Sequence, residues 1–333
     1  MMTVELDQPT IERLSKVIAS LTIRPSFYER PFLAIEMERE VRLRAYFYAV
    51  AICHQTHNLK SERKQLYGWD YLEDGFVRMT QENPDWWRPE QLSQLKIHEI
   101  AGRLAPWFSD EADRGHSTLD RLEERSHLMK DVGKFVWENY NGSFETLFNR
   151  AGERLCFEGR GFYEVMPAME AFSDPLQKKS SFLLKLLQDA GMLQLKDPEN
   201  VIPVMDYHMM RVLLRTGAVE IIDKKLRNKL LQKEPMTSDH GIRNACAKVM
   251  REIGLQSGHG ILKMNDFFWT LGRSCCAETT LCHDRFCAKN PCTFEKVINI
   301  KDHTRCVFED FCHGATSEEY RNLWQPIVKT HYY

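Results

Sequence analysis

The stretch VIPVMDYHMMRVLLRTGAV, residues 201–219, joins a proline-bounded apolar segment to an amphipathic helix pattern through a single carboxylate, Asp206. The helix pattern runs to Gly217, a residue typical of helix ends. Asp206 can be a simple N-cap, because an aspartate before a helix accepts hydrogen bonds from the N–H groups of the first turn. The alternative is a catalytic carboxylate at the start of a helix.

Helical periodicity continues along most of the chain, and no alternating strand pattern exceeds a few residues. The pattern after Arg44 is apolar on all sides, as in a buried central helix. We predict an all-α, two-lobed fold: an N-terminal helical lobe over 1–117, a helical core over 118–273 and a Cys-rich tail over 274–333. The predicted helices cover residues 10–21, 36–56, 117–140, 177–191, 208–217, 223–233 and 239–254.

Composition indicates a globular chain, since 333 residues with 43% apolar and 28% charged side chains can bury a large core. The first residues show neither the basic nor the apolar region of a signal peptide, and no apolar run reaches the roughly 18 residues of a membrane helix. We therefore expect a cytoplasmic protein without membrane association. The net charge of -2 hides a basic region, because residues 207–273 hold twelve Lys and Arg against six Asp and Glu.

A second motif, DPLQKKSSFLLKLL at residues 174–187, places Lys178 and Lys179 at another helix start. Two helix N-termini that converge create positive potential suited to a phosphate. A carboxylate such as Asp206 stays ionised in that field and can stabilise an oxocarbenium-like sugar cation or activate water. We expect the lysines to be solvated or to contact phosphate, with a Schiff-base role for one of them as the alternative.

This arrangement resembles the helix-hairpin-helix superfamily of DNA glycosylases, in which a P-V-D segment supplies the catalytic Asp and bifunctional members use a lysine nucleophile. DPLQKKSS resembles the atypical hairpin of archaeal 8-oxoguanine glycosylases. LEERSHLMKDVGKFVWENYNGSF, MDYHMMRVLLRTGAVEIIDKKLRNKLL and MNDFFWTLGR resemble segments of the queuosine-nucleotide N-glycosylases of queuosine salvage. The resemblance covers roughly residues 118–273 and implies an N-glycosidase with Asp206 and Lys179 as catalytic residues.

Two departures leave the substrate open. CHQTHNLKSERKQLYGWD, residues 53–70, replaces an aromatic segment of the salvage enzymes, and the usual Gly-rich hairpin that grips duplex phosphates is missing. Glycosylases read an extruded base by stacking and by hydrogen bonds to its edge. We expect a base pocket with Lys178 beside it; a core role for the histidine and tryptophan is the alternative. The predicted pocket residues are His54, Gln55, Trp69 and Asp70.

Seven of the ten cysteines lie within residues 275–312, which without an export signal favours a metal site over disulfides. FWTLGRSCCAETTLCHDRFCAKNPC resembles the iron–sulfur loop of adenine and endonuclease III type glycosylases in layout but not in spacing. We predict that four cysteines bind a [4Fe–4S] cluster or a structural zinc, and Cys306 or Cys312 can replace one or two of them. The predicted ligands are Cys276, Cys282, Cys287 and Cys292.

Together these observations predict an N-glycosylase that removes a modified nucleobase from DNA after flipping the nucleotide out. The first alternative keeps the chemistry and takes a free modified nucleotide of the queuosine type. The second alternative is a noncatalytic nucleic-acid-binding protein, against which the intact Asp206 argues.

Overall fold

The computed structural model describes residues 3–24, 30–300 and 302–333, and it is mostly helical, as predicted. The chain forms two compact units, and neither is continuous in sequence. Among the described residues, unit 1 consists of 3–24 and 202–329, and unit 2 consists of 30–201 and 330–333. These boundaries differ from the predicted breaks after residues 117 and 273. None of the described helices is long and apolar enough to cross a lipid bilayer.

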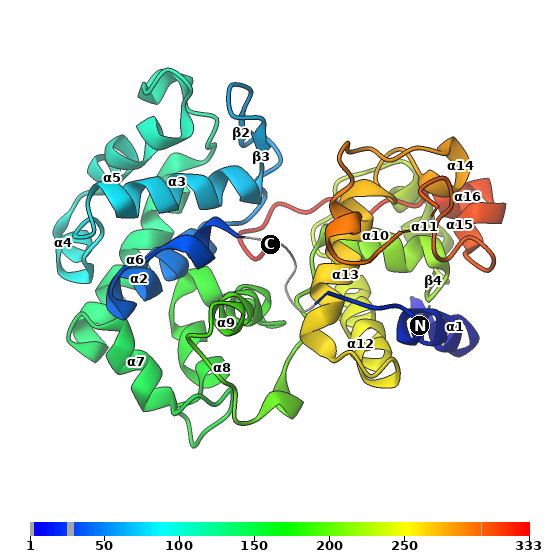
Figure 1. The fold of residues 1–333 in the computed structure, drawn as a ribbon, viewed down its shortest axis with the longest axis horizontal. Helices are drawn as coiled ribbons and strands as arrows, with labels where there is room; N and C mark the ends of the chain where they lie inside the picture. Colours follow the sequence, from blue (N-terminus) through cyan, green and yellow to red (C-terminus); the bar gives the residue numbers. More distant parts are fainter. Residues whose placement is uncertain (1–2, 25–29, 301) are drawn as a thin grey trace. The chain divides into compact units, whose positions relative to one another are not determined.

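Unit 2 is built around a buried helix, α2, which packs against α3, α6, α7 and α9 (Figure 1). Its α-helices are α2 (Arg39–Ala51), α3 (Trp69–Glu82), α4 (Pro89–Gln94), α5 (Ile97–Leu104), α6 (Leu122–Tyr140), α7 (Phe144–Ala151), α8 (Phe162–Val165) and α9 (Lys178–Asp189). The strands β2 (Lys60–Ser61) and β3 (Leu66–Tyr67) form a short antiparallel pair. Its 3-10 turns are η1 (Pro31–Ala34), η2 (Ala105–Phe108), η3 (Arg114–His116), η4 (Met166–Ala168), η5 (Glu170–Phe172) and η6 (Pro198–Asn200).

The buried character of α2 confirms the prediction made from its pattern, because every residue from Leu43 to Ala51 is buried. Aromatic rings dominate its contacts. The Phe47 ring lies 4.6 Å from that of Phe144 and 5.8 Å from that of Phe172, measured between centroids. Large rings supply much of the apolar area removed from water in such a core. This packing fixes the C-terminal end of α2, where residues 51–55 form part of the candidate site.

Unit 1 packs α10 against α13 and α12 against both α1 and α13. Its helices are α1 (Gln8–Ala19), α10 (Tyr207–Thr216), α11 (Lys224–Leu231), α12 (His240–Gln256), α13 (Ile261–Ser274), α14 (Leu281–Asp284), α15 (His313–Thr316) and α16 (Glu318–Asn322), with a 3-10 turn η7 (Thr293–Lys296). The strands β1 (Val4–Leu6) and β4 (Val219–Ile221) pair antiparallel, with Val4 opposite Ile221.

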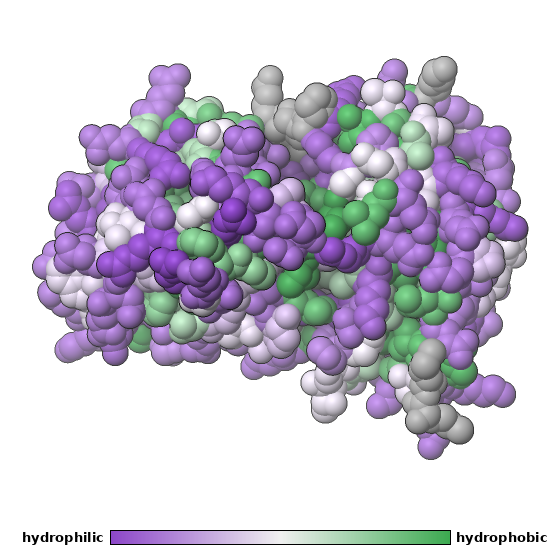
Figure 2. Space-filling model, turned by 90° about the horizontal axis from the view of Figure 1, so that it is seen from below, coloured by the Kyte–Doolittle hydropathy of each residue, from purple (hydrophilic) through white to green (hydrophobic). Residues whose placement is uncertain are grey.

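The opening stretch folds as its sequence predicts. Helix α10 begins after Asp206 and ends at Gly217, whose φ of 82° is the left-handed conformation that glycine adopts without strain. Glycine is also required where α10 and α13 approach, since a Cβ on Gly272 would lie 2.7 Å from the carbonyl oxygen of His208. Polar side chains cover most of the face seen in Figure 2, in keeping with the high charge content.

Candidate functional site

The predicted lysine pair lies at the start of α9, in unit 2. The carboxylate of Asp174 accepts hydrogen bonds from the backbone N–H groups of Leu176 and Lys178, at 3.0 Å and 2.9 Å, which sets the start of the helix. Lys178 is 8% exposed and Lys179 is fully buried. The expectation of a solvated pair is therefore wrong, because the first turn of α9 is buried in unit 2.

Burial changes the chemistry of Lys179. It lowers the pKa of this amine to about 7, and the nearby charges of Lys178 and Arg125 act in the same direction. The Nζ atom donates a hydrogen bond to the carbonyl of Ala51 and lies 3.4 Å from Nδ1 of His54. A large fraction of Lys179 is therefore uncharged near neutral pH, the form in which an amine is a nucleophile.

His54 joins Lys179 to an acidic residue. Its ring is fully buried, and burial, followed by the charges of Lys179 and Arg125, holds the pKa of His54 far below its ordinary value. Nε2 lies 3.3 Å from Oε1 of Glu124, a distance found in ion pairs, but the neutral ring makes this a contact between a dipole and a carboxylate. With Nδ1 toward the lysine, the contacts favour the tautomer that carries its proton on Nε2.

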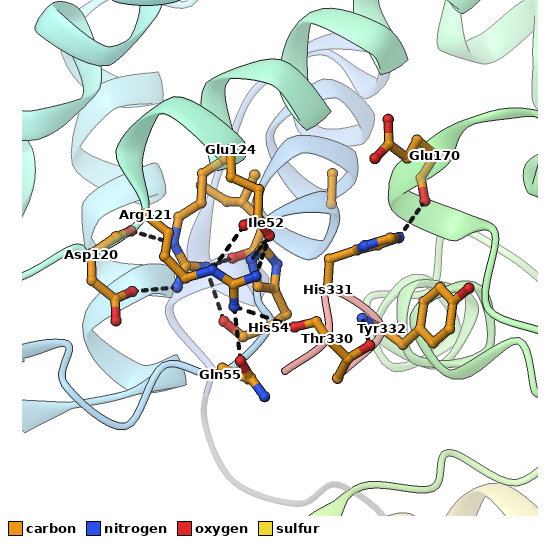
Figure 3. A network of polar contacts seen from close by, with 12 residues as sticks. Ile52, His54, Gln55, Asp120, Arg121, Glu124, Glu170, Thr330, His331 and Tyr332 are labelled. Carbon is orange, nitrogen blue, oxygen red and sulfur yellow. Dashed lines mark hydrogen bonds and ion pairs between the residues drawn. The ribbon is translucent and has the colours of Figure 1, made fainter. Parts of the chain in front are cut away.

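Two arginines hold the loop that carries His54 and Gln55 (Figure 3). Arg125 is fully buried and donates to the carbonyls of Ile52 and His54, the latter at 2.9 Å, and to Asp120. A guanidinium group has five N–H donors in a fixed planar arrangement, so one arginine can donate to several carbonyls at once. The end of α2 is thereby fixed in position by α6, the helix that carries this arginine.

Arg121 makes a second set of bonds on the exposed side of this loop. It pairs with Glu124, with an Nε–Oε2 distance of 2.9 Å, and donates to Oε1 of Gln55 at 2.8 Å and to the carbonyl of Thr330 at 3.3 Å. Gln55, Arg121 and Gln177 all have left-handed backbone, with φ of 44°, 53° and 52°. Such conformations in non-glycine residues are strained and often occur at functional sites.

Residues 330–333 complete this network in unit 2. The backbone N–H of Gln55 donates to the carbonyl of Tyr333 at 3.2 Å, and Nε2 of His331 lies 3.1 Å from the carbonyl of Glu170. Burial and the charge of Lys179 lower the pKa of His331. The segment therefore lies close enough to Lys179 to interact with it electrostatically.

The predicted tryptophan lies beside the same lysine pair. The Trp69 ring meets Phe182 edge to face at 4.9 Å, and Nζ of Lys178 lies 5.1 Å from the centre of the Phe182 ring. Asp70, also predicted, is half-buried in the first turn of α3. Within the described part of the chain, the buried Gln177 Oε1 and Ser180 Oγ have no hydrogen-bond partner. Gln177 is the N-cap of α9 and Ser180 lies in its first turn, so both unsatisfied atoms are next to the lysine pair.

Asp206 belongs to unit 1, and its N-cap role is confirmed. Its Oδ1 accepts hydrogen bonds from the backbone N–H groups of His208 and Met209, at 2.9 Å and 3.2 Å. The residue is 7% exposed. A capping carboxylate is held in one orientation, which is compatible with a catalytic role and does not require one.

The cysteine-rich tail in unit 1 forms a second candidate site, which we call the Cys–His centre. Its four ligand atoms, one from each residue, lie within 4.8 Å of one another, and the residues are Cys275, Cys287, Cys292 and His303. The Sγ atom of Cys275 lies 3.3 Å from that of Cys287 and 3.5 Å from that of Cys292. Nε2 of His303 lies 2.8 Å from Sγ of Cys287. Three thiols and an imidazole at this spacing can hold a metal ion.

The centre also has a supporting hydrogen bond of the kind found in metal sites. Nδ1 of His303, the nitrogen turned away from Cys287, contacts the carboxylate of Glu295. A carboxylate at this position fixes the tautomer of a ligating histidine and increases its basicity. The donor set and its surroundings therefore fit a metal.

Two of the four predicted metal ligands, Cys287 and Cys292, belong to this centre, and the prediction of Cys276 and Cys282 as their partners is wrong. Cys275 takes part instead, at the C-terminal end of α13, where adjacent side chains point in different directions. His303 was not predicted because the predicted ligand set contains cysteines alone, and this histidine lies eleven positions after the last of them, Cys292. Its polar neighbours in KDHTR gave no periodic signal.

Sequence reasoning also missed Arg121, Glu124 and Arg125, although two of them lie in the LEER segment that carries the family resemblance. A buried arginine cannot be distinguished from an exposed one by helical spacing alone. No protein-family model matches the chain, and no curated protein shows significant similarity to it.

Proposed function

We propose that the protein is an N-glycosylase that releases a modified nucleobase from DNA, with Lys179 as the nucleophile. The observation that carries the proposal is the environment of this amine, which is buried, has a pKa of about 7 and adjoins a neutral histidine. An amine that is partly unprotonated at neutral pH can attack a sugar carbon. This differs from the expectation of water activation by Asp206, because burial of the lysine is not visible in the sequence.

In the proposed reaction the Nζ lone pair forms a bond to the anomeric carbon of the sugar as the bond from that carbon to the base breaks. The base leaves with the electron pair of the broken bond and takes up the proton that Nζ loses. Opening of the sugar ring then gives a protonated Schiff base, which water hydrolyses to release the sugar and regenerate the amine. No oxidant or further reactant is needed.

Asp206 belongs to unit 1 and Lys179 to unit 2, so the proposed reaction does not depend on Asp206. The catalytic role expected for this carboxylate from the sequence stays a prediction, beside the N-cap bonds that it makes.

The edge-to-face pair of Trp69 and Phe182 is buried, at 8% and 9% exposed, which matches the core role considered for the tryptophan. One feature of unit 1 supports a nucleic acid as the substrate. Helix α11 projects exposed lysines, which are Lys224, Lys225 and Lys229. Exposed lysines on one short helix suit a phosphate backbone.

For the Cys–His centre we infer a single zinc ion rather than the [4Fe–4S] cluster considered from the sequence. Tetrahedral Zn–S bonds of about 2.3 Å place two sulfur atoms about 3.8 Å apart. The observed Sγ–Sγ distances of 3.3 to 3.6 Å are close to this value. A zinc here orders the tail, and the proposed glycosylase chemistry does not involve it.

The test is borohydride trapping during turnover on a panel of modified-base DNAs and free modified nucleotides, with mass spectrometry of the released bases. We expect a covalent protein–DNA adduct with the native protein and with Lys178→Ala, and none with Lys179→Ala. Asp206→Asn, assayed in the same way, tests separately the catalytic role predicted for this carboxylate from the sequence. Base release without any adduct would overturn the role of Lys179, and release from free nucleotides alone would overturn DNA as the substrate.

A further inference from the structure

Four cysteines of the tail lie outside the Cys–His centre, and they gather in a second group. We call this group the thiol quartet, and its members are Cys276, Cys282, Cys306 and Cys312. All four are half-buried, and none forms a disulfide.

Contacts with one buried arginine bring two members together. Nη1 of Arg215 lies 3.6 Å from Sγ of Cys276, and Sγ of Cys312 lies 3.6 Å from the carbonyl oxygen of Arg215. Cys276 and Cys312 are far apart in the sequence of the tail, and their shared contact with Arg215 brings them to the same part of unit 1.

The other two members are linked by an ion pair. Cys282 lies on α14, and Arg285, directly after this helix, donates to the carboxylate of Glu309 at 2.9 Å. The same carboxylate accepts a hydrogen bond from the backbone N–H of Cys306 at 3.3 Å. The end of α14 is therefore held against the loop that carries Cys306.

The two halves form one cluster. Cys276 pairs through its backbone with Thr280 in the turn that leads to Cys282, and the backbone N–H of Cys312 donates to the carbonyl of Phe308 in the turn that follows Cys306. Two turns that each carry two cysteines, joined by the contacts of Arg215 and by the Arg285–Glu309 ion pair, present a ligand set for a thiophilic metal.

The charges around the quartet match an anionic metal site. Arg211 and Arg215 are both buried, at 3% and 4% exposed. In the described part of the chain their hydrogen bonds go to backbone carbonyls, an amide, an imidazole and the Cys276 thiol, and not to a carboxylate. Carboxylates act on these groups without a direct hydrogen bond, Asp206 on Arg211 and Glu278 on both arginines. Buried guanidinium groups are further stabilised by a negative charge in contact with them. A divalent metal held by four thiolates carries a net charge of about -2 and would supply it.

We propose that Cys276, Cys282, Cys306 and Cys312 form a second metal centre, which binds a thiophilic metal separately from the Cys–His centre. The two ligand sets alternate along the chain: Cys275 belongs to the first and Cys276 to the second, Cys287 and Cys292 to the first, and Cys306 to the second. This arrangement explains why a ligand set chosen from sequence spacing combines members of both centres.

The test is the metal content of the full chain, measured by elemental analysis together with inorganic sulfide. We expect the native protein to hold metal at two centres, either two zinc ions or one zinc and an iron–sulfur cluster. Cys306→Ser should lose the metal of the quartet and keep one zinc, whereas His303→Ala should lose that zinc and keep the metal of the quartet. Cys156→Ser, an exposed cysteine of unit 2, is the matched control and should keep both.

Because a serine variant can fail to fold, Cys306→His provides a second readout. Histidine is also a metal ligand, so this variant should bind Zn²⁺ at two sites when the metal-free protein is titrated with Zn²⁺ alone. Native protein that holds one zinc and no iron as purified and binds only one zinc after metal removal, or disulfides within the quartet under non-reducing mass spectrometry, would overturn the proposal. The glycosylase proposal is independent of either result.

Discussion

The Lys179 network in unit 2 and the Cys–His centre in unit 1 gather reactive side chains by different means. In the first, the carbonyl of Ala51 and the ring of His54 contact the buried amine, and arginines hold the loop that carries His54. In the second, three thiols and an imidazole face one another, and a carboxylate lies behind the imidazole. The first site is ordered by the fold itself, whereas the zinc proposed for the second would add to its stability.

The difference has a consequence for function. A site ordered by its own hydrogen bonds can hold a lysine in an energetically unfavourable state, since the cost is spread over a large core. A metal in the tail would add to the packing of Phe294 and Phe308, which are buried against Phe267 of α13. Variants of the Lys179 network should therefore change the stability of unit 2, whereas variants of the Cys–His centre should change metal binding and the order of the tail.

Removal of the metal from the Cys–His centre should have the largest effect. Structural zinc sites contribute about 10–16 kcal/mol of binding free energy, which is available only to the folded state. A chelator, or Cys287→Ser, should unfold the segment from 275 to 303 while unit 2 stays folded. Limited proteolysis with mass spectrometry would detect this, and unchanged protection of the tail would contradict it.

Arg125→Met should come next, with a loss of about 3–5 kcal/mol in the free energy of unfolding, because it leaves carbonyls and the Asp120 carboxylate without their buried partner. Urea denaturation provides the measurement. Arg160→Met is the control, since the ion pair of Arg160 with Glu158 is exposed and should contribute less than about 1 kcal/mol. Equal losses in the two variants would show that Arg125 does not support the site.

The ionisation of Lys179 should make stability depend on pH. Its folded-state pKa of about 7 lies below the unfolded value near 10.5, so between these values the unfolded chain binds more protons. Stability should therefore rise with pH in this window, by up to about 1.4 kcal/mol per pH unit, and should not change with this group below pH 7. Lys179→Met should lack this rise, which denaturation at pH 7 and 9 would measure.

The smallest expected effect is that of Glu295→Gln, which weakens the hydrogen bond behind His303. Second-shell changes of this kind reduce metal affinity by about 10–100-fold. Competition with a chromophoric chelator would measure the change. A variant with native affinity would show that Glu295 does not orient the ligand.

The sequence predicted the elements better than the sites. Helix α10 begins and ends where its N-cap aspartate and terminal glycine indicate, and α2 is buried as its apolar pattern requires, because capping and periodicity are local properties. The region of His54, Gln55 and Lys179 was found through resemblance. The buried state of Lys179, the arginines that fix the loop and the pairing of cysteines in the tail depend on contacts between distant segments, which no local pattern contains.

The discontinuity of both units has a consequence for how the chain folds. The pairing of β1 with β4 joins residues more than two hundred positions apart, and residues 330–333 complete unit 2 after the whole of unit 1 has been passed. Contacts of such long sequence separation close late and slow folding. During synthesis, residues 30–201 would therefore emerge and collapse with the edge around His54 and Gln55 uncovered. This intermediate is the species most exposed to aggregation and to capture by chaperones.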